Sequence, residues 1–228
     1  MTARELLSWV GDRLAERFGE PAAHSESAVE TLVRTVLSQN TNDVNRDRAY
    51  RELRAQFPDL AAVADADENA VAQVIRSAGL HRQKARTLVG VLSRIRDEQG
   101  ALDLGFLADL TTEDGLRWLT SSRGVGKKTA GIVLLFCFDK PYFPVDTHIR
   151  RICTRLGLLT PGDDAHDRIN PLVSTEARTL RALHLSLIRL GREICHPRAP
   201  ACDRCPLAER CAAAIQLAGQ AAKEGVGS

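Results

Sequence analysis

A glycine turn followed by two lysines is one of two places in the sequence whose residue types could do chemistry. Gly124-Val125-Gly126 stands directly before Lys127 and Lys128, and an apolar run begins at Ile132. Two glycines one residue apart allow a tight turn and a close approach of the backbone to a partner. If the apolar run is a helix, its first N–H groups and the positive end of its dipole form an anion site. The pattern therefore predicts contact with a nucleic-acid phosphate, with an ordinary turn between two helices as the alternative.

The other place is a cluster of four cysteines within 17 residues, separated by six, two and five positions: Cys195, Cys202, Cys205 and Cys211. Proline and charged residues fill the gaps, so this segment has little to bury and needs a core that four thiolates could supply by binding metal. One zinc ion and an iron–sulfur cubane both accept four cysteines, and the spacing does not choose between them. Cys137 and Cys153 stand in apolar helical stretches, and we expect both to be buried thiols.

Composition limits the class of protein. Of the 228 residues 44% are hydrophobic, which is enough for a full core in one or two domains. No apolar run approaches the roughly 18 residues of a membrane span, and the first residues do not have the pattern of a signal peptide. We therefore expect a cytoplasmic protein that has no membrane partner. In that compartment six cysteines favour metal or redox chemistry over disulfides.

The net charge of +2 is small, but the charges are unevenly distributed. From Asn69 to Arg96 there are six basic residues and no acidic one, and from Ser121 to Arg155 there are seven basic and two acidic residues. Both basic segments contain a predicted turn. This suits a surface that lies against phosphates, although a charged run is more often only a solvated face.

The elements that must position these residues are all helical, because no sustained strand alternation appears. Ser27 and Glu30 predict a capping box for a helix that ends near Leu37. The other predicted helices cover residues 4–18, 43–57, 67–79, 81–98, 112–120, 127–138 and 146–156, with two more between 164 and 190. The Ala- and Gly-rich tail after Cys211 is expected to fray. The fold class is therefore all-α, with a helix-hairpin-helix at residues 112–138.

Three motifs in this order resemble the endonuclease III branch of the helix-hairpin-helix DNA glycosylases. They are GVGKKTA at 124–130, VDTHIRR at 145–151 and the C-x6-C-x2-C-x5-C pattern. The resemblance extends from about residue 4 to residue 211. It implies two helical domains with a DNA-binding cleft between them. Residues 23–140 would form a six-helix barrel, and residues 1–22 with 141–228 would carry a [4Fe-4S] cluster on the loop 195–211. It also implies a monomer that acts on double-stranded DNA containing damaged bases or abasic sites, in the cytoplasm beside the chromosomal DNA.

The resemblance also assigns the catalytic residues. The family's nucleophilic lysine falls on Lys128 and its catalytic aspartate on Asp146. A neutral amine attacks the sugar C1′, expels an oxidised pyrimidine and leaves a Schiff base, from which β-elimination cuts the strand. We expect a helix N-terminus, the charge of Lys127 and burial to lower the pKa of Lys128. Asp146 would accept a proton and stabilise positive charge on the sugar. Without the family context, a phosphate contact for Lys128 and a helix N-cap for Asp146 are the simpler interpretations.

Further positions match residues that contact DNA in the family. Leu80 matches a leucine that fills the gap left by an extruded base. The family's gap-filling Gln aligns with Asn40, while Gln39 stands one residue earlier, so the choice between them stays open. The predicted DNA contacts are Gln39, Asn40, Leu80, His81, Arg123, Gly124, Val125, Gly126, Lys127, Thr129 and His148. Ser122-Arg123 replaces the family's usual Leu-Pro, so we expect a looser hairpin entry, a phosphate contact by Arg123, and reduced or altered activity.

Two other functions stay open. The first is a glycosylase that only removes a base, such as an adenine or mismatched-thymine enzyme. The adenine branch usually lacks a lysine at the position of Lys128. The second is a non-catalytic helix-hairpin-helix protein that binds DNA, and the presence of both Lys128 and Asp146 argues against it. The sequence does not name the preferred lesion or opposite base.

Overall fold

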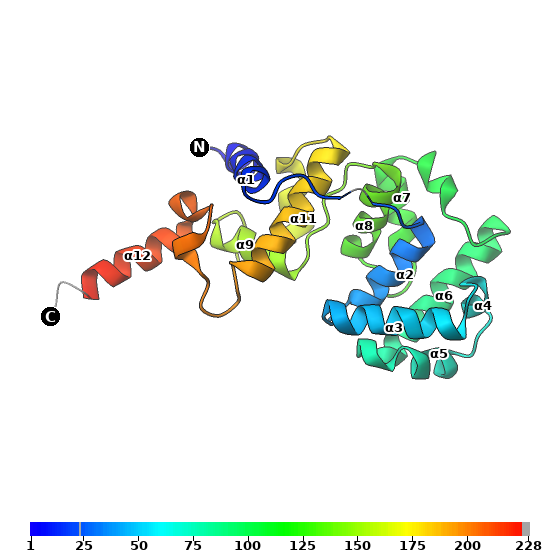
Figure 1. Ribbon diagram of the computed structural model, residues 1–228. Coiled ribbons are helices and arrows are strands. Elements are labelled where there is room, and N and C mark those ends of the chain that lie inside the picture. Colours follow the sequence, from blue (N-terminus) through cyan, green and yellow to red (C-terminus); the bar gives the residue numbers. More distant parts are fainter. Residues whose placement is uncertain (23, 225–228) are drawn as a thin grey trace. The chain divides into compact units, whose positions relative to one another are not determined.

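The computed structural model describes residues 1–22 and 24–224, with side chains for 1–22 and 24–220. Within these residues the regular structure consists of twelve α-helices and five short 3₁₀ helices, with no strand (Figure 1). The all-α prediction is therefore confirmed. The chain forms two compact units. We call His24–Lys140 the central unit, and Met1–Ala23 with Pro141–Ser228 the terminal unit.

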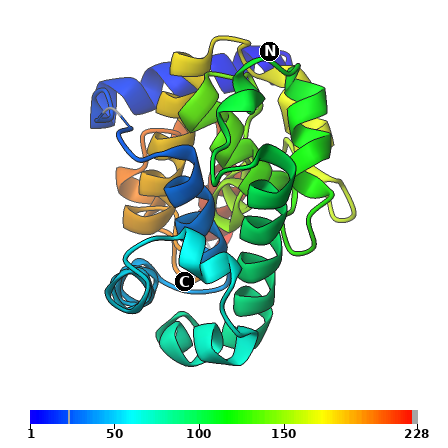
Figure 2. The same cartoon turned by 90° about the vertical axis from the view of Figure 1, so that its right-hand side faces the viewer.

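The central unit contains seven α-helices and two 3₁₀ helices. They are α2 (Ala28–Ser38), α3 (Asp43–Gln56), α4 (Ala61–Ala64), α5 (Glu68–Val74), η1 (Arg76–Ala78), α6 (His81–Gln99), η2 (Gly105–Ala108), α7 (Thr112–Thr120) and α8 (Lys127–Phe138). Helices α3, α6 and α8 all pack on α2. Figure 2 shows α5 lying across one end of the long helix α6.

The core of the central unit is built from apolar residues at helical spacing. Side chains of α2 and α6 without exposed surface belong to one buried cluster: Leu32, Val33, Val36, Leu37, Leu88, Leu92 and Ile95. Burying each of these side chains contributes about 1.5–3 kcal/mol. This cluster holds the C-terminal end of α2 in place, next to the start of α8.

Side-chain caps mark the start of several helices of this unit. Ser27 and Glu30 form the predicted capping box at the start of α2. Asn42 caps α3, because its side chain accepts a hydrogen bond from the Asn45 backbone at 2.9 Å. Asp43, where the sequence predicted this helix to begin, is its first helical residue. Asp67, the first residue of the helix predicted at 67–79, caps α5.

The terminal unit is built on helix α11. Its elements are α1 (Ala3–Phe18), α9 (Thr147–Arg155), α10 (Ala165–Ile169), η3 (Asn170–Leu172), α11 (Ala177–Glu193), η4 (Cys202–Arg204), η5 (Ala208–Arg210) and α12 (Ala212–Glu224). Helices α1 and α9 both pack on α11. Gly191 makes the approach of α9 possible, because a Cβ atom there would lie 2.8 Å from the Cβ atom of His148.

The structure differs from the predicted helices in three places. The single helix expected at 67–79 is broken into α5 and η1. The one-turn helix α4 was not expected. Residues 212–224 of the tail, which was expected to fray, form α12, because this alanine-rich sequence has high helix propensity. Residues 225–228 of the tail lie outside the described residues. None of the described helices is both long and apolar enough to cross a bilayer.

Candidate functional site

The glycine turn joins α7 to α8 as a helix-hairpin-helix. Gly124 has a φ of +85°, and a Cβ atom there would lie 2.1 Å from Thr87 Oγ1, so only glycine fits. Val125 is buried inside the turn and its backbone N–H donates to the Ser122 carbonyl at 3.1 Å. Gly126 is the N-cap of α8 and provides no side-chain cap. The first N–H groups of α8 therefore have no side-chain cap, which is the arrangement that suits an anion.

Lys128 lies in the first turn of α8 and is half-buried. Its Nζ approaches Ser38 Oγ at 3.5 Å, which is a long contact. Ser38 is the last residue of α2 and its hydroxyl donates to the Thr35 carbonyl at 2.7 Å. The oxygen of that hydroxyl is thus the atom that faces the amine. Lys127 is half-buried as well, and Arg123 is exposed.

The two residues after α2 point to different places. Gln39 Nε2 donates to the Gly124 carbonyl at 3.1 Å and to Thr129 Oγ1 at 3.3 Å, so this side chain lies against the hairpin. Thr129 is only 2% exposed. Asn40 is exposed and has a φ of +50°, in the left-handed region. Gln39 and Thr129 therefore support the hairpin from inside, whereas Asn40 presents its side chain to the surroundings.

Leu80 also stands at an exposed tip. It precedes the first residue of α6, His81, and has a φ of +46°. Left-handed backbone costs a residue with a Cβ atom roughly 1–2 kcal/mol. The Leu80 side chain is 52% exposed, so burial within the protein does little to offset this cost. We call Asn40 and Leu80, together with the backbone around them, the two tips.

An arginine holds the entry to the hairpin, where the sequence departs from the usual Leu-Pro. Arg94 Nη1 donates to Ser121 Oγ at 2.6 Å and to Ser122 Oγ at 3.0 Å. Its guanidinium also lies over the ring of Trp118, with the Cζ atom 4.2 Å from the ring centroid. The loose entry that the sequence suggested is thus replaced by a set of polar contacts. Sequence reasoning selected neither Arg94 nor Ser38.

Asp146 and His148 stand at the start of α9 in the terminal unit. Asp146 is half-buried and caps the helix, its Oδ1 accepting from the Ile149 backbone at 2.8 Å. The His148 Nδ1 lies 3.1 Å from Arg151 Nη2. Because arginine can only donate, Nδ1 accepts, and the proton of the neutral ring is on Nε2. The N-cap expected for Asp146 is present, and it engages one carboxylate oxygen.

The loop before Asp146 is held by side chains that no sequence motif marked. Asn170 Oδ1 accepts from the Phe143 backbone at 2.8 Å, and His166 Nε2 accepts from the Val145 backbone at 3.1 Å. His184 donates from Nδ1 to the Pro144 carbonyl at 3.0 Å. The side chains belong to α10, η3 and α11. Three elements that lie later in the chain therefore fix the backbone of the residues just before Asp146.

The four cysteines lie between α11 and α12, on and around the short helices η4 and η5, and all four are half-buried. Burial raises the pKa of the Cys205 thiol, and the thiolates of Cys195, Cys211 and Cys202 raise it further. Arg155 Nη1 donates to Cys195 Sγ at 3.0 Å. Among the described residues, no three His, Cys, Asp or Glu side chains are arranged to hold a single metal ion.

The remaining cysteines behave differently from one another. Cys153 is fully buried as predicted, and burial raises the pKa of its thiol to about 12. Cys137 is only half-buried, which corrects the prediction, since the end of α8 leaves part of the side chain uncovered. Its Sγ lies 3.7 Å from His24 Nε2.

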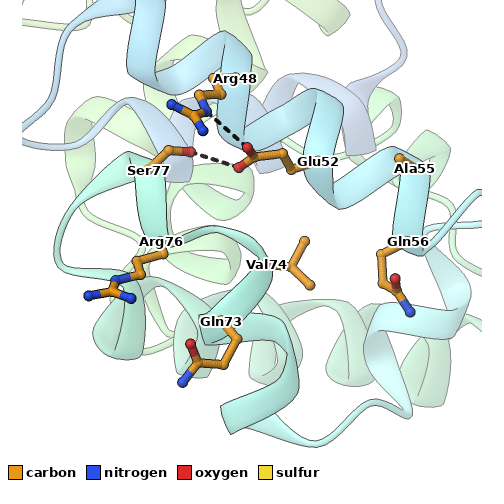
Figure 3. Close-up of a pocket in the computed structure, with 8 residues that line it drawn as sticks. All are labelled: Arg48, Glu52, Ala55, Gln56, Gln73, Val74, Arg76 and Ser77. Carbon is orange, nitrogen blue, oxygen red and sulfur yellow. Dashed lines mark hydrogen bonds and ion pairs between the residues drawn. The ribbon is translucent and has the colours of Figure 1, made fainter.

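A pocket of about 630 Å³ lies in the central unit between α3, α5 and η1 (Figure 3). None of the predicted site residues lines it. Figure 3 shows Glu52 between Arg48, whose Nε donates at 2.9 Å, and Ser77, whose hydroxyl donates at 3.0 Å. The pocket thus marks where η1 is attached to α3 by a side-chain hydrogen bond.

Comparison with known proteins gives consistent results. Residues 33–172 match the family model described as HhH-GPD superfamily base excision DNA repair protein. Endonuclease III of Sulfolobus acidocaldarius is 38% identical over 186 residues, covering 79% of this chain and 80% of that protein. Endonuclease III of Thermotoga maritima is 32% identical over 210 residues, covering 90% and 92%. A solved non-covalent endonuclease III–DNA complex superposes with a TM-score of 0.78 at 25% identity, covering 95% of this chain and 99% of that one.

Proposed function

Because the chain belongs to the endonuclease III family of the HhH-GPD superfamily of base excision DNA repair proteins, we propose that it excises oxidised pyrimidines from duplex DNA. It is a DNA glycosylase with lyase activity at abasic sites. We place the enzyme in the cytoplasm, with the chromosomal DNA as its partner.

The observation that carries the proposal is the position of Lys128. Lys128 is half-buried in the first turn of a helix whose N-terminal N–H groups have no side-chain cap, and its amine lies 3.5 Å from the Ser38 hydroxyl. A helix N-terminus disfavours a nearby positive charge, which favours the neutral amine that a nucleophile must be. The same N–H groups suit a DNA phosphate, so one turn can position the strand and the attacking group together.

The reaction follows from this amine. Lys128 Nζ forms a bond to C1′, the bond from C1′ to the base breaks, and the base leaves with the electron pair and takes up a proton. The nitrogen lone pair then breaks the C1′–O4′ bond, and O4′ takes up a proton, which leaves a Schiff base. This Schiff base makes a C2′ proton acidic, and loss of that proton breaks the C3′–O bond with departure of the 3′ phosphate. Asp146 would stabilise the positive charge that develops on the sugar and accept a proton from the amine. These roles for Lys128 and Asp146 are our proposal.

Extruding a base leaves a gap in the duplex, which an inserted side chain fills. We propose that Leu80 and Asn40 do this, since both stand exposed at tips with left-handed backbone. Gln39 is less suited, because its amide is already bonded to Gly124 and Thr129. Arg123, Lys127 and His148 are proposed to contact phosphates, since arginine and lysine side chains and the His148 Nε2–H can donate to phosphate oxygens.

We propose that Cys195, Cys202, Cys205 and Cys211 hold a [4Fe-4S] cluster. Four half-buried cysteines on one loop between α11 and α12 can supply the four thiolates that such a cluster needs. A zinc ion also accepts four cysteines, and iron content with visible absorption distinguishes the two. When bound, the cluster would supply the core that this loop lacks. Arg155 would then donate to a ligand sulfur and offset part of its negative charge.

The test is borohydride trapping on a panel of duplexes holding thymine glycol, dihydrouracil, uracil, mismatched adenine or an abasic site. We expect nicking at thymine glycol, dihydrouracil and the abasic site, and a trapped protein–DNA adduct with each of these. Lys128→Ala should abolish trapping and leave DNA binding within about threefold, because it removes only the attacking nitrogen.

Lys127→Ala is the matched control, since it removes the neighbouring lysine and should keep trapping. Trapping that persists in Lys128→Ala would show that another residue is the nucleophile. Trapping restricted to abasic DNA would contradict the excision of oxidised pyrimidines.

A further inference from the structure

Lys84 on α6 is the only buried lysine or arginine among the residues whose side chains are described, with 1% of its surface exposed. Its Nζ donates to the carbonyls of Leu37 and Ala78, each at 2.8 Å. Burial lowers the pKa of this ammonium to about 8, so it keeps its proton at neutral pH. Burying an amine is costly unless it is hydrogen-bonded, and these two bonds offset part of that cost.

The two carbonyls belong to the ends of two helices. Leu37 is the last residue but one of α2, and Ala78 is the last residue of η1. Carbonyls in the last turn of a helix have no partner within the helix, and they carry the negative end of its dipole. A lysine is therefore suited to join two such ends.

Each helix end leads directly into one of the two tips. Asn40 follows Leu37 by three residues, and Leu80 follows Ala78 by two. Both tip residues have left-handed backbone, with φ of +50° and +46°. The single amine of Lys84 thus joins the bases of both tips, which are 40 residues apart in the sequence.

Other hydrogen bonds join residues beside each tip to different elements of the central unit. Gln39 joins the Asn40 tip to the hairpin at Gly124, and Ser77 joins η1 to Glu52 of α3 (Figure 3). These bonds fix each tip to its neighbour, but neither joins one tip to the other. The Lys84 amine makes that connection, because it bonds the helix ends that lead into both tips.

We propose that Lys84 is a positioning residue for base extrusion, which holds the Asn40 and Leu80 tips at the separation at which both enter the duplex together. This rests on the proposed function, since it assigns both tips to DNA. A loss of this separation would impair extrusion of a base. It would affect an abasic nucleotide much less, because no base has to be drawn out of the stack.

The test compares two single-turnover rates in the full-length protein: excision of thymine glycol, and nicking of a duplex that already contains an abasic site. Lys84→Met keeps the length and apolar stem of the side chain but removes the donors. We expect excision to fall at least tenfold, since small misplacements near a reacting centre can cost a hundredfold. Abasic-site nicking should fall less than about threefold.

Leu92→Ala is the control for stability, because it leaves a cavity elsewhere on the same helix, in the fully buried core. At temperatures where this variant is folded, any fall in excision of thymine glycol should be matched by an equal fall in abasic-site nicking. 2-Aminopurine placed beside the lesion reports extrusion directly, and its fluorescence rise should be smaller with Lys84→Met. Lys84→Gln, with a shorter side chain that still donates, should lie between wild type and Lys84→Met, and it takes over the test if Lys84→Met does not fold.

Equal losses of excision and nicking in Lys84→Met, or no loss, would overturn the positioning role. Failure of the wild-type protein to nick abasic DNA would instead contradict the proposed function, so the two outcomes can be told apart.

Discussion

At the scale of single residues, stability and function make opposite demands on the tips. Leucine favours neither left-handed backbone nor exposure to water, yet Leu80 has both. Strain of this kind persists where the surroundings fix the backbone, and it concentrates at functional positions. Here the surroundings include Gly79 before the tip and Lys84, bonded to the Ala78 carbonyl, behind it.

Leu80→Asn should therefore leave the free energy of unfolding unchanged or raise it by up to about 1 kcal/mol, because asparagine tolerates left-handed backbone. Single-turnover excision of thymine glycol should fall at least tenfold, since a smaller polar side chain fills the gap poorly. Urea unfolding and single-turnover kinetics measure the two effects.

Leu217→Asn is the matched control, because Leu217 on α12 is 49% exposed against 52% for Leu80. It should leave excision unchanged. A fall in the free energy of unfolding of Leu80→Asn would contradict this account of the tip, because the fall in excision could then come from loss of folded protein.

The residue types of the candidate site could be predicted from the sequence, but their partners could not. The motif around Lys128 predicts an uncapped helix start, and the structure has one. Nothing in the order of residues indicates that Gln39 turns to the hairpin while Asn40 stays exposed, because that depends on Gly124 and Thr129 being 85 and 90 positions away. Lys84 looked like one more charge in a basic run, whereas its neighbours in space bury it.

At the scale of elements, the chain before the glycine turn of the hairpin is restricted by contacts with a neighbouring helix, where the family usually has a proline. Proline would restrict the chain before the glycine turn by fixing its φ angle. In this chain Arg94 of α6 instead bonds Ser121 and Ser122 and stacks on Trp118. The restriction thus comes from a neighbouring helix and not from the turn itself.

If the Arg94 contacts replace the Leu-Pro pair, the effects of changing Arg94 and of restoring Leu-Pro should not be additive. Ser122→Leu with Arg123→Pro should destabilise the wild-type protein by about 1–2 kcal/mol, because it removes an acceptor from Arg94 and places an apolar group beside the guanidinium. In an Arg94→Met background the same pair should be neutral or stabilising. A double-mutant cycle followed by urea unfolding measures the coupling, and effects that add within about 0.3 kcal/mol would contradict it.

Helix starts were easier to predict than helix interruptions. Ser27, Asp67 and Asp164 cap the helices that their positions suggest, since capping depends on residues only three apart. The break between α5 and η1 has no such signal, because it follows from how η1 is attached to α3 through Ser77 and Glu52.

At the scale of the whole molecule, the two units carry different parts of the proposed chemistry. The central unit holds Lys128 and both tips, and the terminal unit holds Asp146, His148 and the four cysteines. The helices of each unit are packed around their own partners. Replacing one of the four cysteines should therefore alter the local stability of the terminal unit more than that of the central unit.

Cys202→Ser should lose iron and visible absorption, and should increase hydrogen exchange around residues 195–211 and at the end of α11, because a loop without its cluster has little apolar core. Exchange in α2, α6 and α8 should stay within about threefold. Cys137→Ser, in the central unit, is the control and should keep both iron and colour. Equal iron content in wild type and Cys202→Ser would remove the cysteines' proposed role.

The packing of α1 on α11 has a consequence for biosynthesis. Leu7, Val10 and Leu14 of α1 are buried in the finished protein, but α11 begins only at Ala177. At about 5–20 residues per second, a ribosome takes roughly 8–32 s to make the 158 residues between Phe18 and Ala177. During that interval the apolar face of α1 has no α11 to pack on, while the whole central unit leaves the ribosome and can fold. A nascent chain stalled before Ala177 should thus be a better substrate for chaperones than one released after α11.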